Sequence, residues 1–400
     1  MERQPLIVGV TGHWGAGRST VATMIASKFD FGVISMSGLI DASEDRHTRV
    51  SDLQTRGDEL RDQGGPEAIA QLAVEKMASE RRGWVVDGIK NPAEAHLLAS
   101  SGEFYMLGVQ ASVEERWRRT RKILASDRNK FDGINARDDE EKDDVGLPIA
   151  HGQRVGDCLA LADAHIWNDA PMRCAAPAQK GTLEELEQKA TRFCETIMSP
   201  GAILPTDIEV RMCQAYAVAR RSPCARRKVG AVITNDSGRI IAEGWNDVPE
   251  GHPACTSRHG ECYRQVLRKE YLSELANLFM CPRCGGALSE AVECTVCGGK
   301  YSHVVPTPHN LDLCRALHAE ERAILQVSKH GGIGIAGGTI FTTTFPCALC
   351  AKKIVGCDIR AVIFAEPYDV PEALEFFEDA NTELFSFEGF SYRSFHRVFG

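Results

Sequence analysis

One histidine and two cysteines stand at spacings that suit a catalytic metal. His318 is followed by Ala319 and Glu320, and Cys347 and Cys350 come later in a Pro-Cys-Ala-Leu-Cys run. A histidine and two thiolates give zinc three ligands and leave the fourth position for water. Bound zinc lowers the pKa of that water towards neutrality. Glu320, two residues beyond the histidine, is then available to move protons instead of binding the metal.

The H-x-E and P-C-x-x-C pair resembles the signature of zinc-dependent nucleobase deaminases. The resemblance implies that Glu320 takes a proton from the water and passes it to the ring nitrogen and then to the leaving ammonia. The alternative is a structural zinc knuckle, or a cysteine pair buried by chance. A structural site would use four ligands and would not need Glu320, which favours the catalytic interpretation.

Composition narrows the class of protein. The chain has 400 residues, enough for two or three domains, and 43% of them are apolar. It lacks a membrane-length apolar run and the apolar core of a secretion signal, so we expect a cytoplasmic protein with no membrane partner. Disulfides are rare in that compartment, and 15 cysteines are expected there if several bind metal. The net charge of −9, with neither half basic, argues against long nucleic acids as partners.

A glycine-rich loop in the first half indicates a phosphate-binding site. Residues 6–10 predict a buried strand, and Val21, Met24 and Ile25 have helical spacing. Backbone N–H groups of a loop between such elements can surround a phosphate at the start of the helix. The candidate nucleotide-binding residues in the loop are Gly12, Gly15, Ala16, Gly17, Arg18, Ser19 and Thr20.

Three side chains bear on what this loop can do. Arg18 stands where P-loops carry lysine, and its longer planar group is not an equal replacement. Ser19 is placed to reach Mg²⁺ bound to a nucleoside triphosphate. Asp87, after a strand expected over residues 84–86, is a candidate for the same ion. The alternative is a glycine-rich turn without a ligand.

Alternating strands and helices in this half predict a parallel sheet covered on both faces. A strand is expected over residues 105–109, and the helix after it carries Arg116, Arg118, Arg119 and Arg121. This cluster is either a lid over phosphates or a solvated basic face. Residues 126–146 are highly charged and predict a mobile loop. The P-loop, Val86-Asp87-Gly88 and residues 162–168 resemble nucleoside-monophosphate kinases and dephospho-coenzyme A kinases.

In the second half, the expected elements present the metal ligands. We expect a helix over residues 206–220, a two-stranded hairpin over 229–246, a helix over 317–327 and a strand over 339–343. Another helix begins at Pro346. The N-termini of the two ligand-bearing helices can then face each other, where their dipoles stabilise thiolates.

Two CxxCGG knuckles predict a second, structural zinc site inserted at about residues 279–303. A closed four-cysteine zinc ribbon matches this spacing, and redox-active thiol pairs are the alternative. Its predicted ligands are Cys281, Cys284, Cys294 and Cys297.

Several stretches, most of them in the second half, resemble deoxycytidylate deaminases, including those with an amino-terminal P-loop domain. Such two-domain proteins act in antiphage defence by destroying the deoxycytidine nucleotide pool. The stretches are residues 224–244, Asn246-Asp247-Val248-Pro249, His318-Ala319-Glu320, residues 342–352, Ala365-Glu366-Pro367-Tyr368, residues 87–92 and the aromatic tail Phe387–Phe399. Arg322 departs from that family, which commonly has Asn there.

The resemblance also implies substrate contacts and a further zinc. Asn246 would contact the sugar, and the base pocket would involve Ala319, Phe345 and Tyr368. A second, noncatalytic zinc near the active site is common in the family. Residues at compatible positions are Cys224, Cys255, His309 and Cys314, with His259 and Cys262 as competing ligands.

Together these observations predict an α/β protein of two domains. Residues 1–198 would form a P-loop domain with helices on both faces of a parallel sheet. Residues 199–400 would form a cytidine-deaminase-like α/β/α domain with a mixed sheet. The predicted activity is zinc-dependent deamination of dCMP or dCTP, regulated by a nucleotide on the P-loop, in a homo-oligomer. The alternatives are a bifunctional nucleotide kinase-deaminase and a single-strand nucleic-acid deaminase.

The two sets of zinc ligands predict at least two zinc ions per chain, and a third if the noncatalytic site is filled. Because binding four thiolates couples metal to folding, Cys281→Ser should lower thermal stability and expression before it alters chemistry. Elemental analysis and thermal melting of the purified protein measure both effects. One zinc per chain in the wild type would contradict the ribbon.

Overall fold

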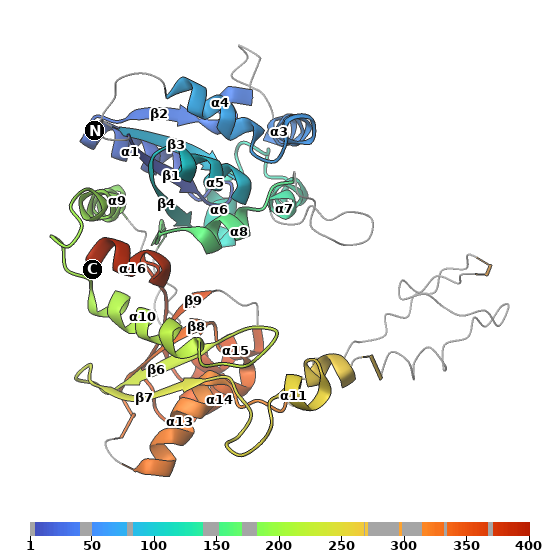
Figure 1. Cartoon of the computed structure of the whole chain (residues 1–400), viewed down its shortest axis with the longest axis vertical. Coiled ribbons are helices and arrows are strands. Elements are labelled where there is room, and N and C mark those ends of the chain that lie inside the picture. Colours follow the sequence, from blue (N-terminus) through green and yellow to red (C-terminus); the bar gives the residue numbers. More distant parts are fainter. Residues whose placement is uncertain are drawn as a thin grey trace. The chain divides into compact units, whose positions relative to one another are not determined.

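The computed structural model describes residues 5–40, 50–77, 83–138, 152–169, 182–267, 269–270, 296–297, 314–331, 334–366 and 371–400. Two compact units contain them (Figure 1). Unit 1 comprises Met1–Cys213 and Phe385–Gly400, and unit 2 comprises Gln214–Leu384. No helix in the described ranges combines the length and the apolar character that crossing a membrane requires.

Unit 1 is built on a six-stranded sheet in the order β11-β5-β4-β1-β3-β2. Neighbouring strands from β5 to β2 are parallel, and β11 is antiparallel to β5. The strands are β1 (Leu6–Thr11), β2 (Gly32–Ser35), β3 (Gly83–Ile89), β4 (Glu103–Gln110), β5 (Ala164–Trp167) and β11 (Gly389–Phe390). The helices are α1 (Arg18–Phe29), α2 (Met36–Ile40), α3 (Val50–Gly64), α4 (Ala68–Lys76), α5 (Pro92–Ser101), α6 (Val113–Thr120), α7 (Arg128–Arg137), α8 (Val155–Leu161), α9 (Leu183–Met198) and α16 (Tyr392–Phe399).

The helices of unit 1 cover both faces of this sheet. Val8 and Val10 of β1 pack into a core with α1 and α9, whereas Ile7 packs into a second core with α4, α5 and α8. Successive side chains of a strand point to opposite faces, so one strand feeds both cores. This arrangement is the one expected of parallel strands, which are buried on both faces.

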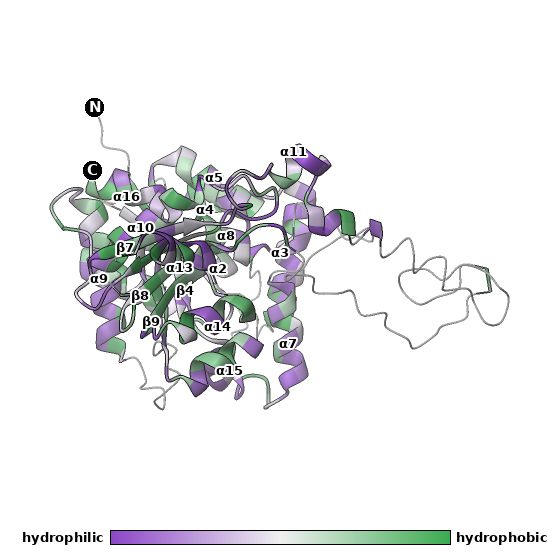
Figure 2. Ribbon diagram, turned by 90° about the horizontal axis from the view of Figure 1, so that it is seen from below, coloured by the Kyte–Doolittle hydropathy of each residue, from purple (hydrophilic) through white to green (hydrophobic). Residues whose placement is uncertain are grey.

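Unit 2 contains a five-stranded mixed sheet in the order β10-β9-β8-β6-β7. Its strands are β6 (Gly230–Thr234), β7 (Ile240–Trp245), β8 (Thr339–Thr344), β9 (Ala361–Glu366) and β10 (Glu383–Ser386). Its helices are α10 (Asp207–Ala219), which begins in unit 1, α11 (Cys255–His259), α13 (Ala319–His330), α14 (Ala348–Gly356) and α15 (Pro371–Asp379). Figure 2 colours most of β9 as hydrophobic, in agreement with the burial of Val362, Ile363 and Phe364. The predicted α/β class, with one mostly parallel and one mixed sheet, is confirmed.

The carboxy-terminal tail belongs to unit 1, although the sequence predicted a boundary after residue 198 with all later residues in one domain. Phe390 stacks on Phe193 with ring centroids 5.5 Å apart. Its N–H donates to the Glu209 carboxylate at 2.9 Å, and Arg192 donates to the same carboxylate. These contacts, together with the pairing of β11 and β5, draw the tail onto the first sheet, so the compact units divide within α10 instead.

The prediction of a mobile loop over residues 126–146 is wrong for its first part. Residues 128–137 form α7, which Asp127 caps by accepting a hydrogen bond from the N–H of Lys130 at 3.2 Å. Phe131 and Ile134 are buried, and their i, i+3 spacing puts both on one face of the helix. The prediction of a mobile loop gave more weight to the many charged residues of this segment than to these two apolar residues. Residues 139–146 lie outside the described residues.

Two glycines let helices approach the sheet of unit 2 from opposite faces. A Cβ on Gly230 would collide with the carbonyl oxygen of Ala215 in α10. A Cβ on Gly244 would collide with the carbonyl oxygen of Ala319 and lie 2.6 Å from the nitrogen of Ala323 in α13. Paired residues of neighbouring strands share a face. Gly230 pairs with Trp245 and therefore shares its face. Gly244 is the residue before Trp245 in the strand, so it lies on the opposite face.

We therefore expect Gly244→Ala to displace α13, the helix that carries Glu320. Overpacking of this kind costs about 1–3 kcal/mol, so the melting temperature should fall by several degrees and deaminase activity should fall with it. Gly356→Ala is the matched control, because no atom lies within 4 Å of a Cβ built there. Equal melting temperatures for the two variants, by calorimetry, would contradict the close approach.

Candidate functional site

The predicted metal ligands lie at one end of the unit 2 sheet. β8 and β9 are parallel and end together, with Thr344 opposite Glu366. β6 is antiparallel to β8, so it begins at this end, and β7 finishes there. His318 occupies the N-cap of α13 and Cys347 the N-cap of α14. The sheet thus brings two helix N-termini to one place, as the sequence predicted.

His318, Cys347 and Cys350 form a compact group. The Nδ1 atom of His318 lies 3.3 Å from the Sγ of Cys347 and 3.4 Å from the Sγ of Cys350. All three ligand atoms lie within 4.8 Å of one another, and no other group of this kind occurs among the described residues. Tetrahedral zinc, with Zn–N of about 2.0 Å and Zn–S of about 2.3 Å, holds such atoms roughly 3.5 Å apart. The donor set therefore fits zinc with one position left open.

The pKa values of the two thiols shift in opposite directions. The hydrogen bond from Cys350, together with His318, lowers the pKa of Cys347 to about 4. The same hydrogen bond and burial raise the pKa of Cys350. Hydrogen bonds with Cys314 and Cys347 raise the pKa of His318 to about 10. Zinc binds thiolates and neutral imidazole, so metal binding would release protons from this group.

Glu320 lies beside these ligands in a buried position. Its side chain is 4% exposed, the Thr342 hydroxyl donates to Oε1 at 3.0 Å, and the Cys350 thiol lies 3.5 Å from Oε2. Burial raises the pKa of Glu320. A raised pKa makes a carboxyl group better able to hold and deliver a proton. Sequence reasoning missed Thr342, because only the fold places this strand residue against α13.

The structure describes three of the four predicted substrate contacts, and the surroundings of their side chains differ. Ala319 is fully buried at the start of α13. Phe345 is 5% exposed and packs edge-on against Phe364 with centroids 4.9 Å apart, so it supports the site from the core. The Asn246 side chain accepts from the Val229 N–H at 2.8 Å and donates to a carbonyl of the same loop. Tyr368 lies outside the described residues.

The other predicted zinc ligands are only partly described. Cys297 is exposed, and its ribbon partners Cys281, Cys284 and Cys294 lie outside the described residues, as does His309. Cys224, Cys255 and Cys314 are partly buried and are not gathered into one metal-binding group. Of the competing ligands, Cys262 is buried and His259 contacts Arg315 at 3.1 Å.

In unit 1, the predicted P-loop runs from the end of β1 to the start of α1. Gly12, Gly15 and Gly17 have positive φ angles of 144°, 84° and 99°, which glycine alone adopts without strain. Ala16 is buried and Thr20 is exposed.

The side chains expected around Mg²⁺ meet in this loop. The Ser19 hydroxyl donates to Asp87 Oδ2 at 2.6 Å. The other oxygen of Asp87 is buried without a hydrogen-bond partner, and so is Nη1 of Arg18.

Of the predicted arginine cluster, Arg116 and Arg119 contact protein groups, whereas Arg118 and Arg121 are exposed. Arg119 donates to the carbonyl oxygens of Gly15 and Ala16, each at 3.3 Å. Arg116 donates to Asn135 at 2.5 Å, and Arg118 pairs with Glu115. Arg116 and Arg119 therefore buttress the loop through protein groups. Asn168, whose amide donates to Ala16 at 2.8 Å, has the same role and was not predicted.

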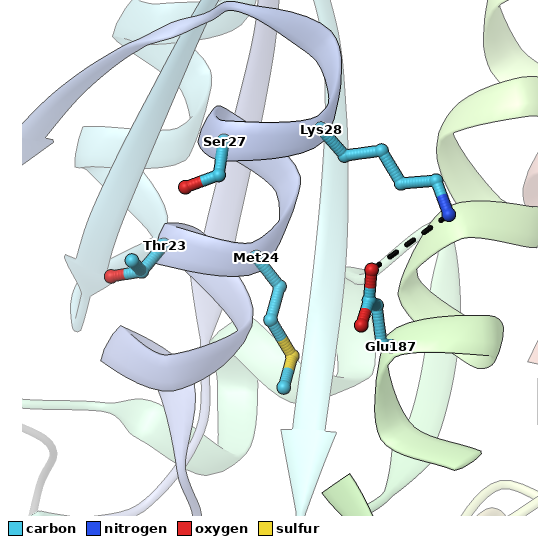
Figure 3. Close-up of a pocket in the computed structure, with 5 residues that line it drawn as sticks. All are labelled: Thr23, Met24, Ser27, Lys28 and Glu187. Atoms are coloured by element: carbon cyan, nitrogen blue, oxygen red, sulfur yellow. Dashed lines mark ion pairs between the residues drawn. The ribbon is translucent and has the colours of Figure 1, made fainter. Parts of the chain in front are cut away.

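A shallow open hollow on unit 1 is separate from these groups. Figure 3 shows its lining along α1 and α9, where Lys28 and Glu187 pair at 3.8 Å. The other lining residues are Thr23, Met24 and Ser27. Its polar residues, Thr23, Ser27, Lys28 and Glu187, are all exposed to solvent, so it is not a candidate site.

Comparisons with known proteins agree with this geometry. The family signature described as "Cytidine and deoxycytidylate deaminase zinc-binding region" matches residues 205–366. The deoxycytidylate deaminase of Schizosaccharomyces pombe is 25% identical over 91% of this chain and 91% of its own length. That of Enterobacteria phage T4 is 31% identical over 39% of this chain and 75% of its own length.

Among solved structures, a dCMP deaminase from cyanophage S-TIM5, crystallised with dCMP and dUMP, is 22% identical and has a TM-score of 0.30. It aligns with 46% of this chain and 99% of its own. The chain belongs to the cytidine and deoxycytidylate deaminase family.

Proposed function

We propose that unit 2 removes the amino group of deoxycytidine nucleotides by hydrolysis, converting dCMP, dCTP or both to the corresponding deoxyuridine nucleotides. The observation that carries this proposal is the buried Glu320 carboxyl beside a His-Cys-Cys group whose spacing suits zinc. The similarity to deoxycytidylate deaminases favours dCMP. The resemblance of the sequence to two-domain defence enzymes supports depletion of the deoxycytidine nucleotide pool during phage infection as the proposed physiological role.

The residues of the site divide the chemistry between them. Zinc held by His318, Cys347 and Cys350 would supply a water of lowered pKa. Glu320 would take a proton from water as the water oxygen bonds to C4, and it would deliver that proton to N3 of the cytosine ring. It would then carry the remaining proton of that oxygen to the amino group, so that the C4–N4 bond breaks, ammonia leaves and a carbonyl remains at C4. Thr342 fixes the carboxyl group during both transfers.

A basic run beside the site suits a phosphorylated substrate. Arg226, Arg227 and Lys228 are exposed and end one residue before β6, at the sheet end that holds the metal group. Arg227 lies 3.8 Å from Glu366 at the end of β9. Arginine and lysine at a site mouth attract phosphate and pair with it through charge-assisted hydrogen bonds.

Glu320→Gln should abolish deamination while zinc content stays near wild type, because Glu320 moves protons and does not bind the metal. The loss should be at least about 10²–10⁴-fold, the usual contribution of general acid–base catalysis. Ammonia release from dCMP and dCTP, with elemental analysis of the same samples, measures both. Glu372→Gln, an exposed carboxyl on α15, is the control. Activity within a few-fold of wild type would refute the mechanism.

We further propose that unit 1 binds a nucleoside triphosphate with Mg²⁺ and regulates the deaminase. The Ser19–Asp87 hydrogen bond motivates this, because it places a hydroxyl and a carboxylate together at the end of the glycine-rich loop. A bound nucleotide can change activity only if it prefers one of two conformations. A bifunctional kinase would use the same side chains, and transfer of labelled phosphate from ATP would identify it.

The double variant Arg18→Ala with Ser19→Ala tests the regulatory role. It should lose nucleotide binding, retain its zinc, and shift deaminase activity up or down relative to wild type. Equilibrium binding of ATP and dTTP, with ammonia release at each nucleotide concentration, measures the coupling. If neither protein's deaminase kinetics respond to any nucleotide, the two units are merely tethered.

A further inference from the structure

A carboxylate of this chain already occupies part of the phosphate-binding loop. Asp138 follows the last residue of α7, and its Oδ2 accepts a hydrogen bond from the backbone N–H of Trp14 at 3.0 Å. Trp14 lies within the glycine-rich loop, whose N–H groups are the ones that bind phosphate oxygens in such loops. Asp138 is fully buried. An internal anion therefore stands where the anion of a ligand would be expected.

Two cations lie close to this carboxylate. The ammonium group of Lys90 lies 3.2 Å from Asp138 Oδ1 and donates to Gln153 at 2.8 Å. Arg18 is near enough that its charge, together with the larger effect of Lys90, holds the pKa of Asp138 below its usual value despite burial. Burial lowers the pKa of Lys90, and Asp138 opposes that effect. Lys90 directly follows β3, so it reaches the loop from the same edge of the sheet as Asp87.

Helix α7 is held over the loop by more than this carboxylate. The rings of Phe131 and Trp14 lie 6.4 Å apart. Gln54 of α3 donates to Asp138 Oδ1 at 3.3 Å and to the carbonyl of Ile134 at 3.4 Å. The carboxyl-terminal end of a helix carries partial negative charge, which adds to that of Asp138. This end of α7 and a bound phosphate would repel each other, so they cannot share the loop.

We propose that Lys90 supplies the phosphate-binding ammonium which the loop itself lacks, and that Asp138 holds the site until the polyphosphate of a nucleoside triphosphate displaces it. The proposal rests on the nucleotide binding proposed above. A compact ammonium can serve a phosphate from outside the loop, as the lysine of a P-loop does from within it. The unpartnered Nη1 of Arg18 and the unpartnered Oδ1 of Asp87 are then the groups that a phosphate and its Mg²⁺ would complete.

Binding of Mg·ATP and of Mg with inorganic triphosphate to the full chain tests this, measured by calorimetry on wild type and variants. Asp138→Asn removes the competing charge and should tighten binding by about tenfold if the carboxylate occupies the loop nine-tenths of the time. Lys90→Met should weaken binding by about tenfold or more, and Lys90→Arg should restore part of it. Lys130→Met and Asp132→Asn, both on the exposed side of α7, are the matched controls and should bind as wild type does.

The double variant Lys90→Met with Asp138→Asn distinguishes two roles of Lys90, namely phosphate ligand and counter-ion of Asp138. It removes both members of the buried ion pair, so neither is left without the other. It should bind weakly, because the cation is gone even though the loop is open. Binding as tight as that of Asp138→Asn alone would overturn the role of Lys90. Binding by Asp138→Asn no tighter than wild type would overturn the role of Asp138 while leaving nucleotide binding intact. No binding by wild type and Asp138→Asn alike would refute the proposed nucleotide site itself.

Discussion

The close approach of α13 to the sheet of unit 2 is the constraint on which the site depends. Glu320 can be buried beside the metal ligands only because Gly244 offers no Cβ to hold the helix away. A buried carboxyl without partners would be costly, and the Thr342 hydroxyl from β8 offsets part of that cost. The same burial raises the pKa of Glu320, which suits it to proton transfer. The short distance between α13 and β7 at Gly244 therefore determines the packing of Glu320, its hydrogen bond to Thr342 and its suitability for proton transfer.

The two cysteines and the histidine converge for a related reason. β8 and β9 are parallel, so α14 must begin at the end of the sheet where β8 finishes. His318 opens its helix near the end of β7, where Leu317 and Asp247 pair as an isolated bridge. Placing all three ligands at helix starts puts thiolates near positive dipole ends, which favours their charged form. The metal group is thus a consequence of strand direction as much as of residue type.

Sequence reasoning located the parts that depend on local pattern and missed those that depend on distant segments. His318, Cys347 and Cys350 were found because their spacing is specific, and the glycine-rich loop because a strand and a helix flank it. α7 was missed because two apolar anchors, Phe131 and Ile134, are outnumbered by charged residues. Thr342 and Asp138 were missed because each acts on a residue far away in the chain, Glu320 and Trp14. Only the tertiary fold creates such pairs.

The placement of the carboxy-terminal tail also depends on contacts between segments that are far apart in the sequence. The chain enters unit 2 within α10 and leaves it at β10, so the deaminase unit is inserted between two segments of unit 1.

Glu209, which is 1% exposed, joins these segments by accepting hydrogen bonds from Arg192 and from the N–H of Phe390. Burial alone would raise the pKa of Glu209, but these hydrogen bonds and that from Thr206 outweigh it and keep the pKa low. The carboxylate is therefore charged at neutral pH, and unit 1 holds both ends of the inserted unit through a paired buried ion. An insertion joined to the rest of the chain at both ends has fewer conformations available than a domain on a single linker.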